Sequence, residues 1–197
     1  MNILDKLLKV EPTGIKANAG KIIISAPFMH DYFFGRSIVI LLEHNEDGSM
    51  GFIINKPSEL FVSDMIEGFP DVSLPLFIGG PVQTDSIFFI HNRPDLIDDS
   101  IKVYGDLHWG GNFKQLRTFI AEGMIQPNEI RFFLGYSGWE AQQLDEELNA
   151  ETWIVANKLS YEKIMNTDAN KLWRNTVKSL GKKYLHWLNF PKNPGEN

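Results

Sequence analysis

The sequence contains no cysteine among its 197 residues. A chain without thiols forms no disulfide and uses no thiolate as a nucleophile or metal ligand. It also lacks any run of about eighteen apolar residues, the length that a membrane-spanning helix requires. Its first ten residues, MNILDKLLKV, interrupt their apolar positions with charges, which is not the pattern of a secretory signal. These absences favour a cytoplasmic protein with no membrane partner.

Positive charge is also scarce. Nineteen basic side chains stand against twenty-five acidic ones, which gives a formal net charge of −6. Affinity for nucleic acid comes mainly from Lys and Arg side chains that displace counterions from phosphates. The densest basic cluster, Lys178, Lys182 and Lys183, is small. We therefore expect no specific nucleic-acid binding, and a direct DNA-binding regulator is only the second alternative for the function.

Short apolar runs bounded by turn residues predict a protein rich in strands. Hydrophobic residues make up 43% of the chain, enough for the core of a globular domain. Apolar positions at helical spacing predict helices after Ser58, after Asn112, from Trp139 and near residues 168–180. The predicted strands lie within residues 20–26, 36–43, 50–54, 74–82, 85–91, 129–135 and 152–157.

The clearest local signal is a hairpin at Asp47-Gly48, because an Asp-Gly pair between two apolar runs tolerates the backbone of a tight turn. Its first strand is apolar on both faces, so we expect it in the interior of the sheet. Strands and helices are mixed without a regular βαβ rhythm. The fold class expected is α+β, a single domain over residues 1–197 with a large mixed, twisted sheet flanked by helices. Residues 1–18 would form an N-terminal helix or arm, and residues 191–197 a frayed tail.

Four blocks of sequence, in this order and at this spacing, resemble the YqgE/AlgH family. The first is GKIIISAPFMHDYFFGRSIVILLEHNEDGSMGFIINKP, and the others are LFIGGPV, DLHWGGNF and RFFLGYSGWEAQQLDEEL. The resemblance implies a cytoplasmic bacterial protein of one α+β domain. The family has no established biochemical activity, although some members are described as candidate transcriptional regulators. The function expected is a binding or regulatory module that acts through a protein partner or a small anionic ligand.

The block around Ser137 raises the question of a reaction. An apolar strand, a Gly-Tyr-Ser-Gly turn and an acidic helix give the local order of a nucleophile elbow. The elbow needs glycine two residues before and two after the serine, and Gly135 is present but Trp139 is not glycine. A histidine must also follow, and His186 is the only one that does. We favour Ser137 as the cap of a helix that begins near Trp139. A hydrolase with Ser137 as nucleophile is the leading alternative.

Other polar residues are candidates for ligand contact. The Gly79-Gly80 turn offers main-chain N–H groups that can converge on an anion, although a plain turn between strands is the commoner explanation. Asn55 and Lys56 follow the predicted hairpin, and polar residues at strand ends often border clefts. The candidate ligand-binding set is therefore Asn55, Lys56, Gly79, Gly80 and Ser137.

The five histidines are scattered, and none has the spacing of a metal motif. We expect each of them to be a surface or turn residue. The sequence predicts no metal site and no cofactor.

Overall fold

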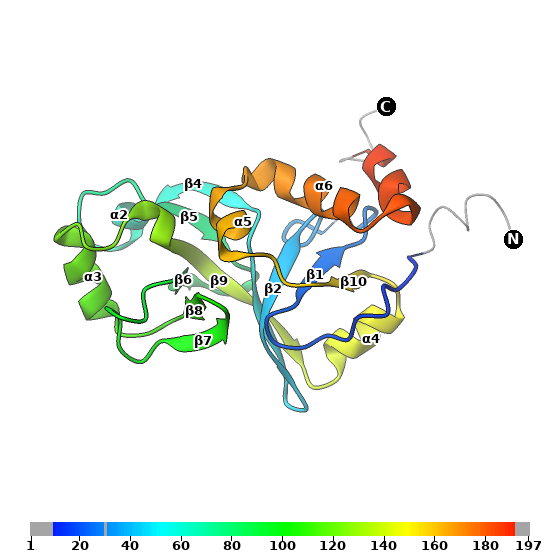
Figure 1. Cartoon of the computed structure of the whole chain (residues 1–197), viewed down its shortest axis with the longest axis horizontal. Coiled ribbons are helices and arrows are strands. Elements are labelled where there is room, and N and C mark those ends of the chain that lie inside the picture. The colour runs from blue at the N-terminus through cyan, green and yellow to red at the C-terminus, as the bar shows by residue number, and fades with distance from the viewer. Residues whose placement is uncertain (1–9, 30, 192–197) are drawn as a thin grey trace, which may run out of the picture.

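The computed structural model describes residues 10–29 and 31–191 of the chain. Its strands form one sheet in the order β10-β1-β2-β3-β9-β6-β8-β7, with β5 beside β9 and β4 beside β5 (Figure 1). The β5–β9 pair is parallel, and the other described pairs are antiparallel. The expected α+β class with a mixed sheet is confirmed.

The strands are β1 (Ile22–Ser25), β2 (Ile38–Asn45), β3 (Gly48–Ile53), β4 (Pro57–Phe61), β5 (Pro75–Ile78), β6 (Val82–His91), β7 (Ile101–Tyr104), β8 (Leu107–Trp109), β9 (Ile130–Glu140) and β10 (Trp153–Ala156). The α-helices are α2 (Val62–Met65), α3 (Phe113–Ala121), α4 (Gln143–Asn149), α5 (Tyr161–Asn166) and α6 (Ala169–Ser179). Two 3₁₀ segments, η1 (Pro127–Glu129) and η2 (Lys182–Asn189), complete the described elements.

The β2–β3 hairpin is confirmed. Asn45 pairs with Gly48, so Glu46 and Asp47 form the bend and Gly48 closes it with a φ of +139°. The apolar part of β2, residues 38–42, is buried, and β2 lies between β1 and β3. The interior position predicted from its two apolar faces is therefore correct.

The long strand β9 joins the two halves of the sheet. Its residues 132–134 pair with β5, whereas residues 137–140 pair with β3. The change of partner falls at Gly135, whose φ is +65°. Gly79, which follows β5, donates its N–H to the Leu134 carbonyl (2.8 Å) and accepts from the Ile53 N–H (2.9 Å). The end of β5 thus lies against β9 near Gly135, the point at which β3 replaces β5 as the neighbour of β9.

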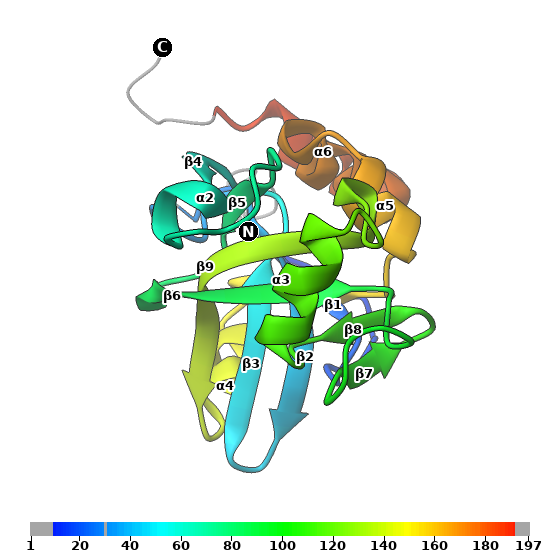
Figure 2. The same ribbon diagram turned by 90° about the vertical axis from the view of Figure 1, so that its left-hand side faces the viewer.

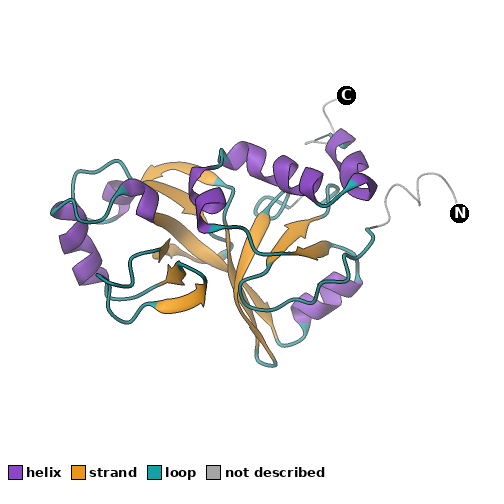
Figure 3. Cartoon of the chain, in the orientation of Figure 1, coloured by secondary structure: helices purple, strands orange, loops and turns teal. Residues whose placement is uncertain are grey.

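Helices cover both faces of the sheet (Figures 1, 2 and 3). Because side chains alternate along a strand, Ile22 and Ile24 pack into the cluster that contains Trp173 of α6, while Ile23 packs toward Leu144 of α4. A third cluster, under α2 and α3, is built around Phe132 of β9. The strand β9 therefore contributes to the packing of every helical layer.

The helices α3 and α6 fall where periodicity places them, whereas α4 begins at Gln143 rather than at Trp139, and α5 was not predicted. Asn112 caps α3 by accepting from the N–H groups of residues 114 and 115, and α6 occupies the predicted segment. The helix predicted after Ser58 is wrong, because Pro57–Phe61 is strand β4 and α2 spans only Val62–Met65. The Ser58 hydroxyl donates to the Leu76 carbonyl (2.9 Å) of β5 rather than capping a helix. Strands β7 and β8 were not predicted, because they have only four and three residues.

Residues 10–18 form an irregular arm rather than a helix, and Thr13 donates its hydroxyl to the Val155 carbonyl of β10. The rest of the expected N-terminal helix or arm, residues 1–9, and most of the expected tail, residues 192–197, lie outside the described residues. None of the helices in the described part of the chain has the length and apolarity to cross a bilayer.

The junction at Gly79 predicts a large effect for one added methyl group. A Cβ on Gly79 would lie 2.2 Å from the Gly135 carbonyl oxygen, so main chain must move. Gly79→Ala should lower the free energy of unfolding by about 3 kcal/mol, the upper part of the range for overpacking. Gly123→Ala is the control, because its φ of +70° is unfavourable but no atom lies within 4 Å. Gly123→Ala should lower the free energy of unfolding by only about 1–2 kcal/mol. Urea denaturation measures both, and equal losses would contradict the close-approach explanation.

Candidate functional site

Ser137 lies inside strand β9 and not in a turn. It pairs with Gly51 of β3, is fully buried, and donates its hydroxyl to the Gly79 carbonyl (3.0 Å). Its predicted role as a helix cap is wrong, because α4 begins at Gln143. The glycines that suggested a turn serve close contacts instead: a Cβ on Gly135 would lie 2.6 Å from the Val82 carbonyl oxygen. A shielded hydroxyl that is bonded to a main-chain carbonyl gives the hydrolase alternative no support.

Trp139 is a core anchor, as expected, but it belongs to β9 rather than to the helix. Its indole N–H donates to a carboxylate oxygen of Glu147 (3.0 Å), and the Trp153 indole donates to the same oxygen (2.8 Å). The two rings lie 6.0 Å apart in an edge-to-face arrangement. One carboxylate on α4 therefore fixes this helix to two strands of the sheet.

Asn55 and Lys56 line a cavity of 340 Å³ between the end of β3, the loop before β2 and the first turns of α6. Of the five candidate residues, the structure brings only these two into the cavity. Gly79, Gly80 and Ser137 cluster at the β5–β9 junction, where Gly80 packs against the main chain of residues 136 and 137. The full lining is Tyr32, Gly35, Arg36, Asn55, Lys56, Pro57, Ile78, Asn170, Trp173 and Arg174. We call this space the basic cavity.

Asn55 builds one wall of the basic cavity. Its side-chain oxygen accepts from the Ile38 N–H (2.7 Å), and its side-chain nitrogen donates to the Arg36 carbonyl (2.9 Å). Both bonds attach the loop before β2 to the end of β3. Asn55 is therefore a positioning residue for the loop, with its amide already engaged.

Three cationic side chains, Arg36, Lys56 and Arg174, line the basic cavity, and no Asp or Glu is among its described lining residues. Lys56 donates to the Tyr32 carbonyl (2.7 Å), which holds its ammonium group at the rim. The Arg36 guanidinium lies 5.2 Å from the centre of the Trp173 ring, a cation–π distance. Sequence reasoning found Lys56 by its place after a strand. It missed the two arginines, which no local pattern marks.

Arg36 has three unfavourable features. Burial lowers the pKa of its guanidinium, and the charge of Arg174 lowers it further. Its Nε atom is buried without a hydrogen-bond partner. Its backbone has a φ of +52°, which is uncommon for a residue other than glycine. Each of these features is unfavourable without a compensating interaction.

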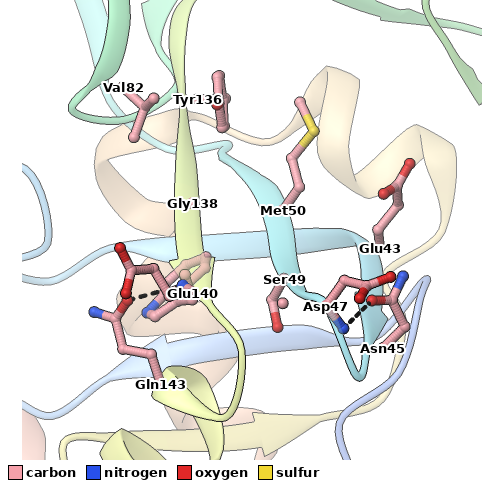
Figure 4. A pocket seen from close by; sticks show the side chains of 12 residues that line it. Glu43, Asn45, Asp47, Ser49, Met50, Val82, Tyr136, Gly138, Glu140 and Gln143 are labelled. Carbon is pink, nitrogen blue, oxygen red and sulfur yellow. Dashed lines mark hydrogen bonds between the residues drawn. The ribbon is translucent and has the colours of Figure 1, made fainter.

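A second, more open cavity of 620 Å³ has the opposite character (Figure 4). It lies over the β2–β3 hairpin and the end of β9. Glu43, Asp47 and Glu140 line it together with Met50 and Tyr136, and its described lining contains no Lys or Arg. In Figure 4 the carboxylates stand on both sides of the groove, Glu140 beside Gln143 on one side and Glu43 and Asp47 on the other.

The expectation that every histidine is a surface or turn residue is wrong for two of them. His91 of β6 is fully buried, and its register partner His108 of β8 is 8% exposed, with the two rings 5.9 Å apart. His91 donates from Nε2 to the Gly110 carbonyl (3.1 Å), while its Nδ1 accepts from the Arg93 N–H (3.1 Å). Burial lowers the pKa of His91 to about 4, and His108 adds to the lowering.

The described residues contain no group of three or more His, Asp or Glu side chains placed to hold a metal ion. His91, whose pKa lies near 4, is thus a neutral, hydrogen-bonded part of the fold. Two further cavities, of 400 and 380 Å³, are lined in part by Thr13 and Ile15 of the N-terminal arm.

Fold and cavities together define a single-domain α+β protein built on a mixed sheet with β9 at its centre. Residues 22–185 match the model of the family described as AlgH-like. A UPF0301 protein of Bacteroides thetaiotaomicron is 41% identical over 198 residues, all of both chains. One from Chlorobium limicola is 43% identical over 92% of this chain and 97% of that one. The chain belongs to the AlgH-like family.

Solved structures support the same assignment. The solution structure of AlgH from Pseudomonas aeruginosa superposes with a TM-score of 0.69 at 28% identity, over 85% of this chain and 94% of that one. A crystal structure of a protein from Corynebacterium diphtheriae gives a TM-score of 0.72 over 91% and 95% of the two chains. Its identity is 20%, so it shows a shared fold alone.

The buried His91 predicts a specific dependence of stability on pH. Its pKa in the folded protein, about 4, lies below the value of about 6.5 expected in the unfolded chain. Its contribution to stability is therefore complete above pH 6.5 and is lost as pH falls toward 4. Between pH 6.5 and 4, one such group makes the free energy of unfolding fall by up to about 1.4 kcal/mol for each pH unit. His91→Gln should lower stability at pH 7.5 but show a shallower decline between pH 6.5 and 4.5. Parallel curves for the two proteins would contradict this account.

Proposed function

We propose that this protein binds a small anion, one that carries phosphate or carboxylate groups, in the basic cavity, and that it acts as a binding or regulatory module. One observation carries the proposal: Arg36, Lys56 and Arg174 come from three separate segments to one cavity that no described carboxylate lines. Lys158, Lys163 and Lys183 form a similar grouping in a cavity of 380 Å³, but the described lining of that cavity has no arginine, whereas the basic cavity has two. The observation supports the ligand-binding form of the module rather than the hydrolase or DNA-binding alternatives.

The chemistry of the three side chains fits an anion. A guanidinium presents planar N–H donors that match the oxygens of phosphate or carboxylate, and an ammonium adds a compact charge. Burial lowers the pKa of the Arg36 guanidinium, and repulsion from the charge of Arg174 lowers it further. A bound anion relieves this repulsion. It also offers an acceptor near the Arg36 Nε atom, which has none.

Titration with inorganic pyrophosphate at low ionic strength, followed by isothermal calorimetry, tests the proposal. Wild-type protein should bind one equivalent in the micromolar to millimolar range. Lys56→Gln and Arg174→Gln should each weaken binding about tenfold, because a hydrogen bond to a charged group contributes about 1.5–3 kcal/mol. Citrate in place of pyrophosphate distinguishes a carboxylate ligand from a phosphate ligand.

Lys171→Gln is the matched control. It removes the same charge from the same helix, α6, but Lys171 is outside the cavity lining and pairs with Asp168 (3.2 Å). It should leave pyrophosphate affinity within about twofold, because Lys171 makes no contact with the cavity and its charge is offset by Asp168. Equal weakening by all three variants would mean a diffuse charge effect and not a site. An absence of binding by wild-type protein at millimolar pyrophosphate would overturn the proposed function.

A further inference from the structure

Both arginines of the basic cavity also hold the C-terminal end of the described chain. The Arg36 guanidinium donates from Nη2 to the Phe190 carbonyl, and the Arg174 guanidinium donates from Nη1 to the Leu188 carbonyl (3.3 Å). The Phe190 ring contacts the loop before β2 through Phe28, with ring centroids 6.5 Å apart. Residues 188–190 therefore lie against the cavity through the groups that an anion would use.

A neutral carbonyl is a weaker acceptor for a guanidinium than an anionic oxygen. An anionic oxygen adds charge–charge attraction to the hydrogen bond, and phosphate or carboxylate groups accept two parallel N–H bonds from one guanidinium, which a single carbonyl oxygen does not. The Arg174 bond is already long at 3.3 Å, and Arg174 is exposed, so its side chain has freedom to turn. An anion that draws both guanidiniums toward itself takes them from the carbonyls of residues 188 and 190.

We propose that a bound anion and the C-terminal residues 188–190 compete for Arg36 and Arg174, so that occupation of the basic cavity releases this segment. The inference rests on the proposed function, since it names the regulation of the same site. It also gives the binding event a structural output.

Anion binding and the docking of residues 188–190 are coupled equilibria, and each changes the other by the same factor. The competition can therefore be tested by weakening the docking or by adding the anion. Phe190→Ala removes the ring that packs on Phe28 and so weakens the docking of residues 188–190. This variant should bind pyrophosphate more tightly than wild-type protein, by about fivefold at the lower end of typical couplings. Leu185→Ala is the control, because Leu185 is exposed on η2 and outside the cavity lining. Its affinity should equal that of wild-type protein.

Hydrogen exchange gives the second measurement. The Phe190 N–H, which donates to the Trp187 carbonyl (3.4 Å), should exchange faster when saturating pyrophosphate is present. The N–H groups of strand β2 serve as the internal reference and should not change.

The possible outcomes separate the two proposals. Pyrophosphate binding with unchanged exchange at Phe190 and unchanged affinity in Phe190→Ala would overturn the competition and leave the anion site intact. Slower exchange at Phe190 would also overturn it, because the anion would then clamp the segment. If wild-type protein binds no pyrophosphate, the proposed function fails and the competition fails with it.

Discussion

The architecture depends on the close contact between the end of β5 and the middle of β9. Main chain approaches main chain there without side chains between, which is possible because Gly79 and Gly135 carry no Cβ. The contact lets β9 leave β5 and continue beside β3, so that one strand holds both halves of the sheet. Ser137 adds a buried hydrogen bond to the Gly79 carbonyl. A serine that suggested catalysis is part of this junction.

The same junction sets the position of the basic cavity. Ile78, the residue before Gly79, donates its N–H to the Lys56 carbonyl (2.8 Å). The end of β5 therefore fixes the residues that follow β3. Asn55 then fixes the loop that carries Arg36. Trp173, anchored by its indole N–H on the Ser25 carbonyl (3.3 Å), places α6 and Arg174 on the opposite side. Neutral contacts thus place three cationic side chains, Arg36, Lys56 and Arg174, around one cavity.

Sequence reasoning succeeded where the signal is local and failed where it is not. The β2–β3 hairpin and the helices α3 and α6 follow from turn chemistry and periodicity within a few residues. The Gly-Tyr-Ser-Gly segment was misread as a turn, because Gly135 serves a close approach to the carbonyl oxygens of Gly80 and Val82, which the local sequence does not show. Lys56 was found by its place after a strand. Arg36 and Arg174 were missed, because only the packing of α6 beside the loop before β2 brings them to one cavity.

The central claim is that this cavity is an anion site, and a crystal soaked in tungstate tests it most directly. Tungstate has the shape and charge of a phosphate-like dianion, and its anomalous scattering locates it without a prior model of the ligand. The account predicts one strong peak within hydrogen-bond distance of the Arg36, Lys56 and Arg174 side chains, with the carbonyls of residues 188 and 190 no longer bonded to the arginines. A cavity without a peak, in crystals where tungstate binds elsewhere on the same molecule, would contradict it.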